Sequence, residues 1–447
     1  MASNAFANLV TGVSATVFQI GLTAIATRSF GSNGFPIWAL AMSLAALVPL
    51  FSANLSTVVT RRLLERSPTT SEMVVVQAAA KYAKRLSCVA IFAILAISVG
   101  LHGWSVPLRN VGLAGFVSLV ALLVAGQMWQ IMLQPGFGRY FARERNWNVA
   151  LTTIFARLGA LAGMGFLCWL VAGRPQLAAA SLTLGACIGL YLVHKVLKGG
   201  DLLEKVPVEQ TEDEYAAMRP FLKAFIVWSI SAAAIQYGLP AIMSILSPTD
   251  FSAFYLAYTL NLVVVGTVAA AASALLAPLG RKRLAGHWDS LERWMKFAPI
   301  MTGLMLLLFL TIVWYALPVL LRVWSAGVSP PDQVRHSLLW LALQTIARSM
   351  TMVYSVLLSS GGRPGQLSRP VILELTLTCS VALAAGFVFG ETAFLATLAI
   401  TGLVTAVYTV WITLNLDMCP SHSRFRLMGI FLLSQIFTLG SWILITR

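Results

Sequence analysis

Long apolar segments are the feature that most constrains what this chain can fold into. A window of about 19 apolar residues with few charges predicts a membrane-spanning helix, and thirteen such segments follow one another along the sequence. They are residues 8–27, 36–59, 86–106, 111–133, 148–172, 177–194, 221–245, 252–278, 296–317, 336–359, 371–388, 392–413 and 427–445. Hydrophobic residues make up 58% of the chain and charged residues 11%, against about 25% charged in soluble domains. The sequence therefore predicts an all-α polytopic membrane protein.

The basic residues are distributed unequally between the two sets of loops. With the N-terminus in the cytoplasm, the loops on that side hold twenty-three of the 31 lysines and arginines. The other side holds six, and two lie inside spans, Arg157 and Arg348. This asymmetry follows the positive-inside rule. We therefore expect a cytoplasmic N-terminus, and the net charge of +15 reflects topology, so no nucleic-acid partner is expected.

Motifs of catalytic chemistry are missing from the sequence. The five histidines do not cluster, and the five cysteines show no paired spacing, so neither a metal site nor a disulfide framework is indicated. The glycine-rich residues 361–366 lack the lysine and hydroxyl of a phosphate-binding loop. We expect no enzyme activity and no cofactor.

An internal repeat divides the chain into two halves. Residues 18–25 (FQIGLTAI) match residues 235–242 (IQYGLPAI), and residues 35–44 match residues 251–260. In both copies the next helix ends in a basic cluster. Six spans, an even number, separate the copies, so both insert with the same orientation and the repeat is parallel. The repeat predicts two six-helix bundles, related by a pseudo-twofold axis, around a central cavity.

The predicted organisation has four parts. They are an N-terminal six-helix bundle at 1–198, a cytoplasmic linker at 199–220, a C-terminal six-helix bundle at 221–415, and a C-terminal tail at 416–447. The linker carries an acidic cluster that is typical of a solvated helix, and Thr211 with Glu214 predicts a capping box at its start. The tail contains the thirteenth segment, and the sequence leaves open whether that segment crosses the membrane.

Ionisable residues inside apolar spans are the candidates for a binding site. A charge at mid-bilayer costs roughly 2.5–3.5 kcal/mol on the insertion scale, so such groups face a protein interior or a wet cavity. Arg157 and Arg348 lie deep in their spans, whereas Arg28 and Lys223 lie near span ends and could also snorkel to the headgroups. Glu374 is the one carboxylate inside a span, so it can neutralise only one of the deep arginines.

Amide side chains also occur inside the spans. Gln19 and Gln236 occupy matching places in the repeat, and interhelical hydrogen bonding is the alternative explanation for each amide. The amides considered for the lumen are Gln19, Asn54, Gln127, Gln236, Asn261 and Gln344. Together with the arginines they predict a polar, cationic lumen, which suits an anionic, hydroxyl-rich substrate.

Two hairpins resemble those of a known group of transporters. Residues 24–66, AIATRSFGSNGFPIWALAMSLAALVPLFSANLSTVVTRRLLER, resemble the opening hairpin of the polysaccharide-transporter families, and residues 244–264, SILSPTDFSAFYLAYTLNLVV, resemble the corresponding later hairpin. These families include the Wzx-type O-antigen and exopolysaccharide flippases of the multidrug/oligosaccharidyl-lipid/polysaccharide (MOP) exporter superfamily. The resemblance implies a V-shaped MOP/MATE-like fold that works by alternating access.

The resemblance also implies a substrate and roles for residues. The substrate would be an undecaprenyl-pyrophosphate-linked oligosaccharide, moved across the bacterial inner membrane. Membrane lipid, polysaccharide polymerase and chain-length machinery are the further partners expected. Arg28 corresponds by position to a first-helix arginine of the related lipid II flippases. Arg157 and Arg348 match no motif and are candidates for the pyrophosphate from their burial in the spans alone, and Lys223 is a candidate at the start of its span. Because some relatives are ion-coupled, Glu374 is the candidate for ion coupling.

Two other transport functions remain open. An ion-coupled MATE-like multidrug exporter would need buried carboxylates to bind cations, and the first bundle has none inside its spans. A lipid II flippase would share the pyrophosphate requirement. The sequence identifies neither the glycan, nor the coupling ion, nor the oligomeric state.

Overall fold

The computed structural model consists of helices that are long and apolar enough to cross a membrane. It describes residues 2–48, 55–65, 72–109, 111–143, 145–170, 175–197, 208–284, 286–325, 327–360, 364–415 and 421–446. Ten described helices meet the length and hydropathy expected of a span, and one bent pair adds an eleventh. These described residues contain no strand. The expected all-α architecture is confirmed.

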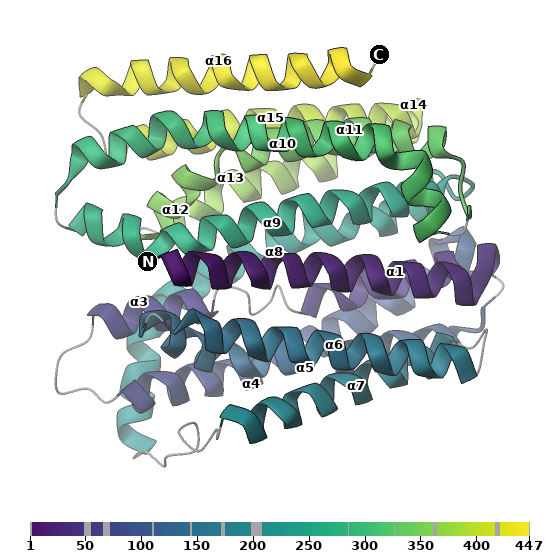
Figure 1. Cartoon of the computed structure of the whole chain (residues 1–447). Coiled ribbons are helices and arrows are strands. Elements are labelled where there is room, and N and C mark those ends of the chain that lie inside the picture. The colour runs from purple at the N-terminus through teal and green to yellow at the C-terminus, as the bar shows by residue number, and fades with distance from the viewer. Residues whose placement is uncertain are drawn as a thin grey trace. The chain divides into compact units, whose positions relative to one another are not determined.

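The helices form two compact units, Met1–Pro248 and Thr249–Arg447, and are labelled in Figure 1. The first unit contains α1 (Ala2–Ala45), α3 (Leu55–Glu65), α4 (Glu72–Trp104), the 3₁₀ helix η1 (Val106–Leu108), α5 (Leu113–Ala142), α6 (Asn146–Leu170), α7 (Pro175–Leu197) and α8 (Val208–Leu246). The second contains α9 (Phe251–Leu284), α10 (Trp288–Trp324), α11 (Pro331–Ser349), α12 (Met352–Ser360), α13 (Pro364–Leu377), the π-helix η3 (Thr378–Ala382), α14 (Leu383–Phe389), α15 (Glu391–Asn415) and α16 (Ser421–Thr446).

A glycine separates the first two predicted spans. The long helix α1 is broken at Gly31, where φ is 61° and ψ is −168°, a backbone region that essentially only glycine adopts. Span 8–27 lies before this break, and span 36–59 begins after it. The predicted turn between the two spans therefore lies at Gly31, where one helix ends and the next begins.

Two more predicted spans explain why fewer than thirteen single helices meet the criteria. Span 336–359 consists of α11 and α12, which are bent by 42° relative to one another. Span 177–194 falls on α7, of which only Ala178–Ile188 is counted as an apolar helix.

Helices α5 and α6 make most of the helix contacts in the first unit. Helix α6 lies along α7 and against α1, while α5 packs on α3, α4 and α7 (Figure 1). The contact between α6 and α7 requires glycine, because a Cβ built on Gly185 would clash with the carbonyl oxygen of Gly159. This close approach positions α6 and its polar side chains between α1 and α7.

Helix α8 packs on α4, α1 and α3 in the first unit. The division between the two compact units lies between Pro248 and Thr249, after α8. The acidic segment of α8 supplies the reason: Glu214 pairs with Arg62 of α3, and Glu212 pairs with Lys81 of α4. The predicted capping box is wrong, because α8 already begins at Val208, upstream of Thr211.

Helix α11 is the centre of the second unit, where it packs on α9, α15 and α10. The last helix, α16, packs on α10 and α11. Trp442 of α16 is fully buried, and its Nε1 donates to the carbonyl oxygen of Leu339 at 3.3 Å. Ser423–Thr446 is among the helices that could span a membrane. The thirteenth segment is thus an integral part of the second unit.

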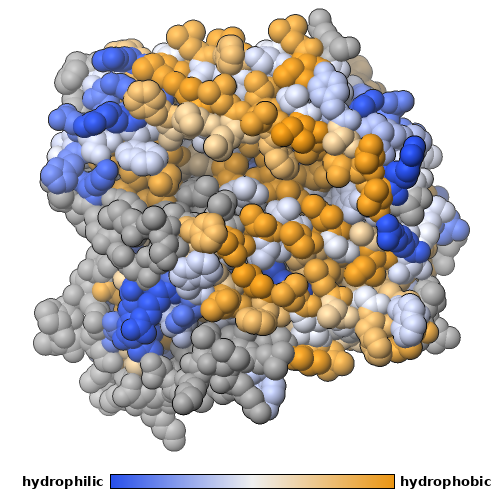
Figure 2. All heavy atoms as spheres, in the orientation of Figure 1, coloured by the Kyte–Doolittle hydropathy of each residue, from blue (hydrophilic) through white to orange (hydrophobic). Residues whose placement is uncertain are grey.

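Exposed side chains on the helix walls are largely apolar. Figure 2 shows hydrophobic side chains over the middle lengths of the helices on the visible face and hydrophilic side chains towards the helix ends. Phe92, Trp169 and Leu433 are each more than two-thirds exposed. An apolar surface of this extent is unfavourable in water, whereas it is compatible with the acyl chains of a lipid bilayer. The chain is a multi-pass membrane protein.

Candidate functional site

Arg157 lies at the contact between α6 and α1. Its Nη1 donates hydrogen bonds to the carbonyl oxygen of Thr11 at 2.8 Å and to Ser14 Oγ at 2.7 Å. Among the described residues, its Nε and Nη2 donors have no hydrogen-bond partner. The guanidinium is therefore anchored at one nitrogen and retains donors for a ligand.

A small pocket with a largely apolar lining adjoins Arg157. It is lined by Phe18, Leu123, Gly126, Gln127, Trp129, Gln130, Ala156, Arg157, Ala160, Leu182 and Ala186, from α1, α5, α6 and α7. Its volume is about 20 Å³, enough for about one water molecule. Gln130 Nε2 donates to Gln127 Oε1 across the wall. The pocket thus joins one cation to two amides.

The charge of Arg157 has no acidic counterpart inside the spans of the first unit. Both of its described partners are neutral, and the predicted spans of this half contain no aspartate or glutamate. A charge in the membrane normally pairs with an opposite charge or lines a wet cavity. The site is therefore electrostatically suited to an anion.

The other residues predicted in the first half have different surroundings. Among the described residues that line the Arg157 pocket, Gln127 is the one further predicted site residue. Arg28 is exposed, three residues before the break at Gly31, and Lys223 is exposed on α8. Gln19 and Gln236 are half-buried on α1 and α8. Asn54 lies outside the described residues.

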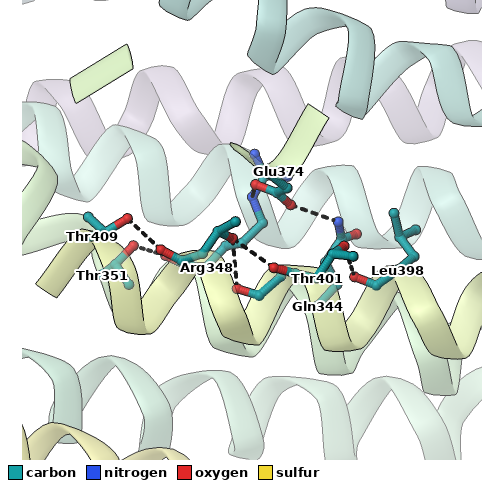
Figure 3. A network of polar contacts seen from close by, with 9 residues as sticks. Gln344, Arg348, Thr351, Glu374, Leu398, Thr401 and Thr409 are labelled. Carbon is teal, nitrogen blue, oxygen red and sulfur yellow. Dashed lines mark hydrogen bonds and ion pairs between the residues drawn. The ribbon is translucent and has the colours of Figure 1, made fainter. Parts of the chain in front are cut away.

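A second polar cluster lies in the second unit, where α11 meets α13 (Figure 3). Glu374 of α13 is buried, with 3% of its surface exposed. Its Oε1 accepts from Gln344 Nε2 at 3.1 Å, and its Oε2 lies 3.4 Å from Arg348 Nε. The structure therefore pairs the one in-span carboxylate with Arg348, and the charge of Arg348 is compensated.

The amide of Asn261 has a separate partner in the same unit. Its Oδ1 accepts a hydrogen bond from Thr345 Oγ1 at 2.7 Å, which joins α9 to α11. Thr345 follows Gln344 directly in the sequence.

Gln344 is held in place by the packing of α15 against α11. A Cβ built on Gly402 of α15 would lie 2.8 Å from Gln344 Cγ. Three of the predicted residues, Gln344, Arg348 and Glu374, thus form one cluster.

Two partners of Arg157 were not expected from the sequence. They are Thr11 and Ser14 of α1, which anchor its guanidinium. One signal was available: hydroxyl residues three apart in an apolar span lie on one helix face. Their partner on α6 is set by tertiary packing, which the spacing does not reveal.

The chain is similar in fold to solved structures of MATE transporters. Structures described as the outward-facing and inward-facing conformations of a multidrug resistance MATE family transporter of the MOP superfamily share 13% identity with it, at TM-scores of 0.66 and 0.62. The alignments cover 95% of both chains for the first, and 96% of this chain and 95% of the other for the second. A MOP superfamily transporter from Pyrococcus furiosus shares 12% identity over 95% of both chains, at a TM-score of 0.63.

Comparison of the sequence with protein families and with curated proteins finds no significant match. At 12–13% identity the structural similarity establishes the fold and leaves the substrate to be argued from the site. The chain has the fold of the MATE transporters of the MOP superfamily.

Proposed function

We propose that this protein is a flippase that moves undecaprenyl-pyrophosphate-linked oligosaccharides across the bacterial inner membrane by alternating access. The fold supports transport, because solved transporters with this fold are described in outward-facing and inward-facing conformations. The observation that carries the choice of substrate is Arg157, a cation inside the first unit with neutral partners and unused donors.

An arginine with unused donors is well suited to a pyrophosphate. The guanidinium presents its N–H groups in a planar fork that matches phosphate oxygens, and hydrogen bonds between charged groups are about twice as strong as neutral ones. The anchoring of Nη1 on α1 fixes the side chain before the ligand arrives, so little conformational freedom is lost on binding. Arg28 and Lys223, both exposed, are proposed to assist the passage of the same group.

Amides beside the cation supply a means of recognising sugars. Gln127 and Gln130 line the Arg157 pocket, and each amide offers both donors and acceptors to hydroxyl groups. We assign the same role to Gln19 and Gln236, with Asn54, Asn261 and Gln344 as further sugar contacts.

The roles proposed for Arg348 and Glu374 are constrained by their ion pair. Arg348 offers a substrate less net charge than Arg157 does, because Glu374 lies 3.4 Å from its Nε. A coupling cation at Glu374 would compete with Arg348 for the carboxylate. Arg157 is therefore the leading candidate for the pyrophosphate, and ion coupling at Glu374 requires the pair to open during the cycle.

A multidrug exporter that binds cations is the main alternative. Its substrates would meet an arginine and no carboxylate in the spans of the first half, which disfavours cations by Coulomb repulsion. The Pyrococcus furiosus transporter with this fold is described as having a binding pocket of reversed polarity that suggests a different function. The same fold is thus compatible with more than one kind of substrate. A lipid II flippase would also use Arg157 and differs only in the glycan.

Glycan export by cells that depend on this protein tests the proposal. We expect Arg157→Ala to abolish export and Arg157→Lys to retain part of it, at unchanged membrane levels. Arg348→Ala should reduce export, and Arg322→Ala, an exposed arginine of α10, should leave it normal. Normal export by the Arg157→Ala variant would exclude the site. Drug resistance conferred without glycan export would favour the multidrug exporter.

A further inference from the structure

An open pocket lies between the end of α9 and the beginning of α10 in the second unit. Its volume is about 410 Å³, within the range of small-molecule sites. Its lining includes Lys282, Ser290, Arg293, Trp294, Phe297 and Met301. The surrounding loop is among the most basic in the sequence, so the positive-inside rule places it in the cytoplasm.

One end of the pocket carries two cations. Lys282 Nζ donates to Ser290 Oγ at 2.8 Å, which holds the ammonium group beside α10. Arg293 is exposed and forms no ion pair with a described residue. The described lining contains no carboxylate. This end therefore attracts an anion.

The other end is apolar and continues along one face of α10. Trp294, Phe297 and Met301 are spaced by three and four residues, so they share a helix face. They are 38%, 61% and 54% exposed. A tryptophan next to basic residues is typical of the membrane–water interface. The apolar stripe therefore lies where acyl chains begin, directly beside the cations.

We propose that this pocket binds an anionic phospholipid of the cytoplasmic leaflet. The headgroup phosphate lies between Lys282 and Arg293, and an acyl chain packs along Trp294, Phe297 and Met301. A free phosphate would use only the cationic end, whereas a zwitterionic lipid would bring its own cation into a basic pocket. The site is separate from the Arg157 pocket, and it stands whether or not the protein is a flippase.

Brominated lipids test this site, because bromine quenches tryptophan fluorescence only at short range. The full chain is reconstituted in vesicles of phosphatidylcholine with either brominated phosphatidylglycerol or brominated phosphatidylcholine. The signal of Trp294 is the difference between the unchanged chain and the Trp294→Phe variant. We expect brominated phosphatidylglycerol to quench Trp294 at lower mole fractions than brominated phosphatidylcholine does. Lys282→Gln and Arg293→Gln should each weaken this preference for phosphatidylglycerol about fivefold.

A variant that loses two cations elsewhere, a larger change in charge than either pocket variant, distinguishes a specific site from general attraction. Lys84→Gln with Arg219→Gln removes two exposed cations from the cytoplasmic ends of α4 and α8 and should leave the Trp294 preference unchanged. Equal quenching by the two lipids, or an equal loss in this control, would overturn the proposal. Should the Lys282→Gln variant unfold, Arg293→Gln alone decides, because that side chain is exposed and has no ion pair to lose among the described residues.

Discussion

Arg157 and Arg348 differ in what surrounds their positive charge. Arg348 faces the buried carboxylate of Glu374, and this ion pair joins α11 to α13. Arg157 contacts a carbonyl oxygen and a hydroxyl group, which satisfy hydrogen bonds but do not neutralise the charge. The two arginines are similar in depth along the sequence, yet only Arg157 retains its full attraction for an anion.

Gly31 offers a test of the break between the first two spans. At its φ of 61° and ψ of −168°, any residue other than glycine has a strained backbone. A Cβ there would meet no atom within 4 Å, so a substitution causes no steric clash. We expect Gly31→Ala to lower the free energy of unfolding by about 1–3 kcal/mol through backbone strain alone, measured by denaturation in detergent.

The matched control for Gly31 is Gly100 in α4. A Cβ at Gly100 also meets no atom within 4 Å, and its φ is not positive. Because alanine favours a helix over glycine by about 1 kcal/mol, Gly100→Ala should be neutral or stabilising. Equal effects of the two substitutions would argue against the strained backbone at Gly31.

Helix α8 is attached to α3 and α4 by charged and aromatic contacts. Arg62 Nε lies 2.5 Å from Glu214 Oε1, and its Nη2 donates to Oε2 at 3.2 Å. The guanidinium of Arg61 lies 4.2 Å from the ring centroid of Phe221. The acidic cluster that the sequence indicated as a solvated helix is thus partly used in packing, which accounts for the position of α8 in the first unit.

Substitution of two glutamates on one turn of α8 tests how much these contacts stabilise the packing of α8 on α3 and α4. Glu214 is 7% exposed, and its replacement by Gln removes a bidentate pair with Arg62, so we expect a loss of about 1–3 kcal/mol in the free energy of unfolding. The side chain of Glu212 is 49% exposed, and Glu212→Gln should cost at most about 1 kcal/mol. A larger effect at Glu212 than at Glu214 would contradict the packing described.

Hydrophobicity predicted the membrane-spanning helices because it acts locally along the chain. Each span is recognised from its own residues, and even the doubtful segment 427–445 is the apolar helix α16. The partners of the polar residues could not be predicted in this way. Arg157 and Glu374 were recognised as exceptional groups in apolar spans, but only packing determines that Arg157 contacts α1 and that Glu374 pairs with Arg348.

The central proposal is that Arg157 binds the pyrophosphate of a lipid-linked glycan during transport. The fold alone is shared with proteins described as multidrug transporters, so the claim depends on the charge of one residue. The most direct test uses purified protein in proteoliposomes, where no other export machinery is present.

That measurement follows how fast a polyprenyl-pyrophosphate-linked oligosaccharide becomes accessible to a membrane-impermeant lectin. The unchanged protein should translocate this lipid and should move the same glycan poorly on a polyprenyl carrier without phosphate. Arg157→Gln should slow translocation of the pyrophosphate-linked lipid about 10-fold or more, as loss of a hydrogen bond between charged groups predicts. The rate for Arg157→Lys should lie between those of Arg157→Gln and the unchanged protein. Equal rates for Arg157→Gln and the unchanged protein, or equal rates for the charged and uncharged lipids, would contradict the account.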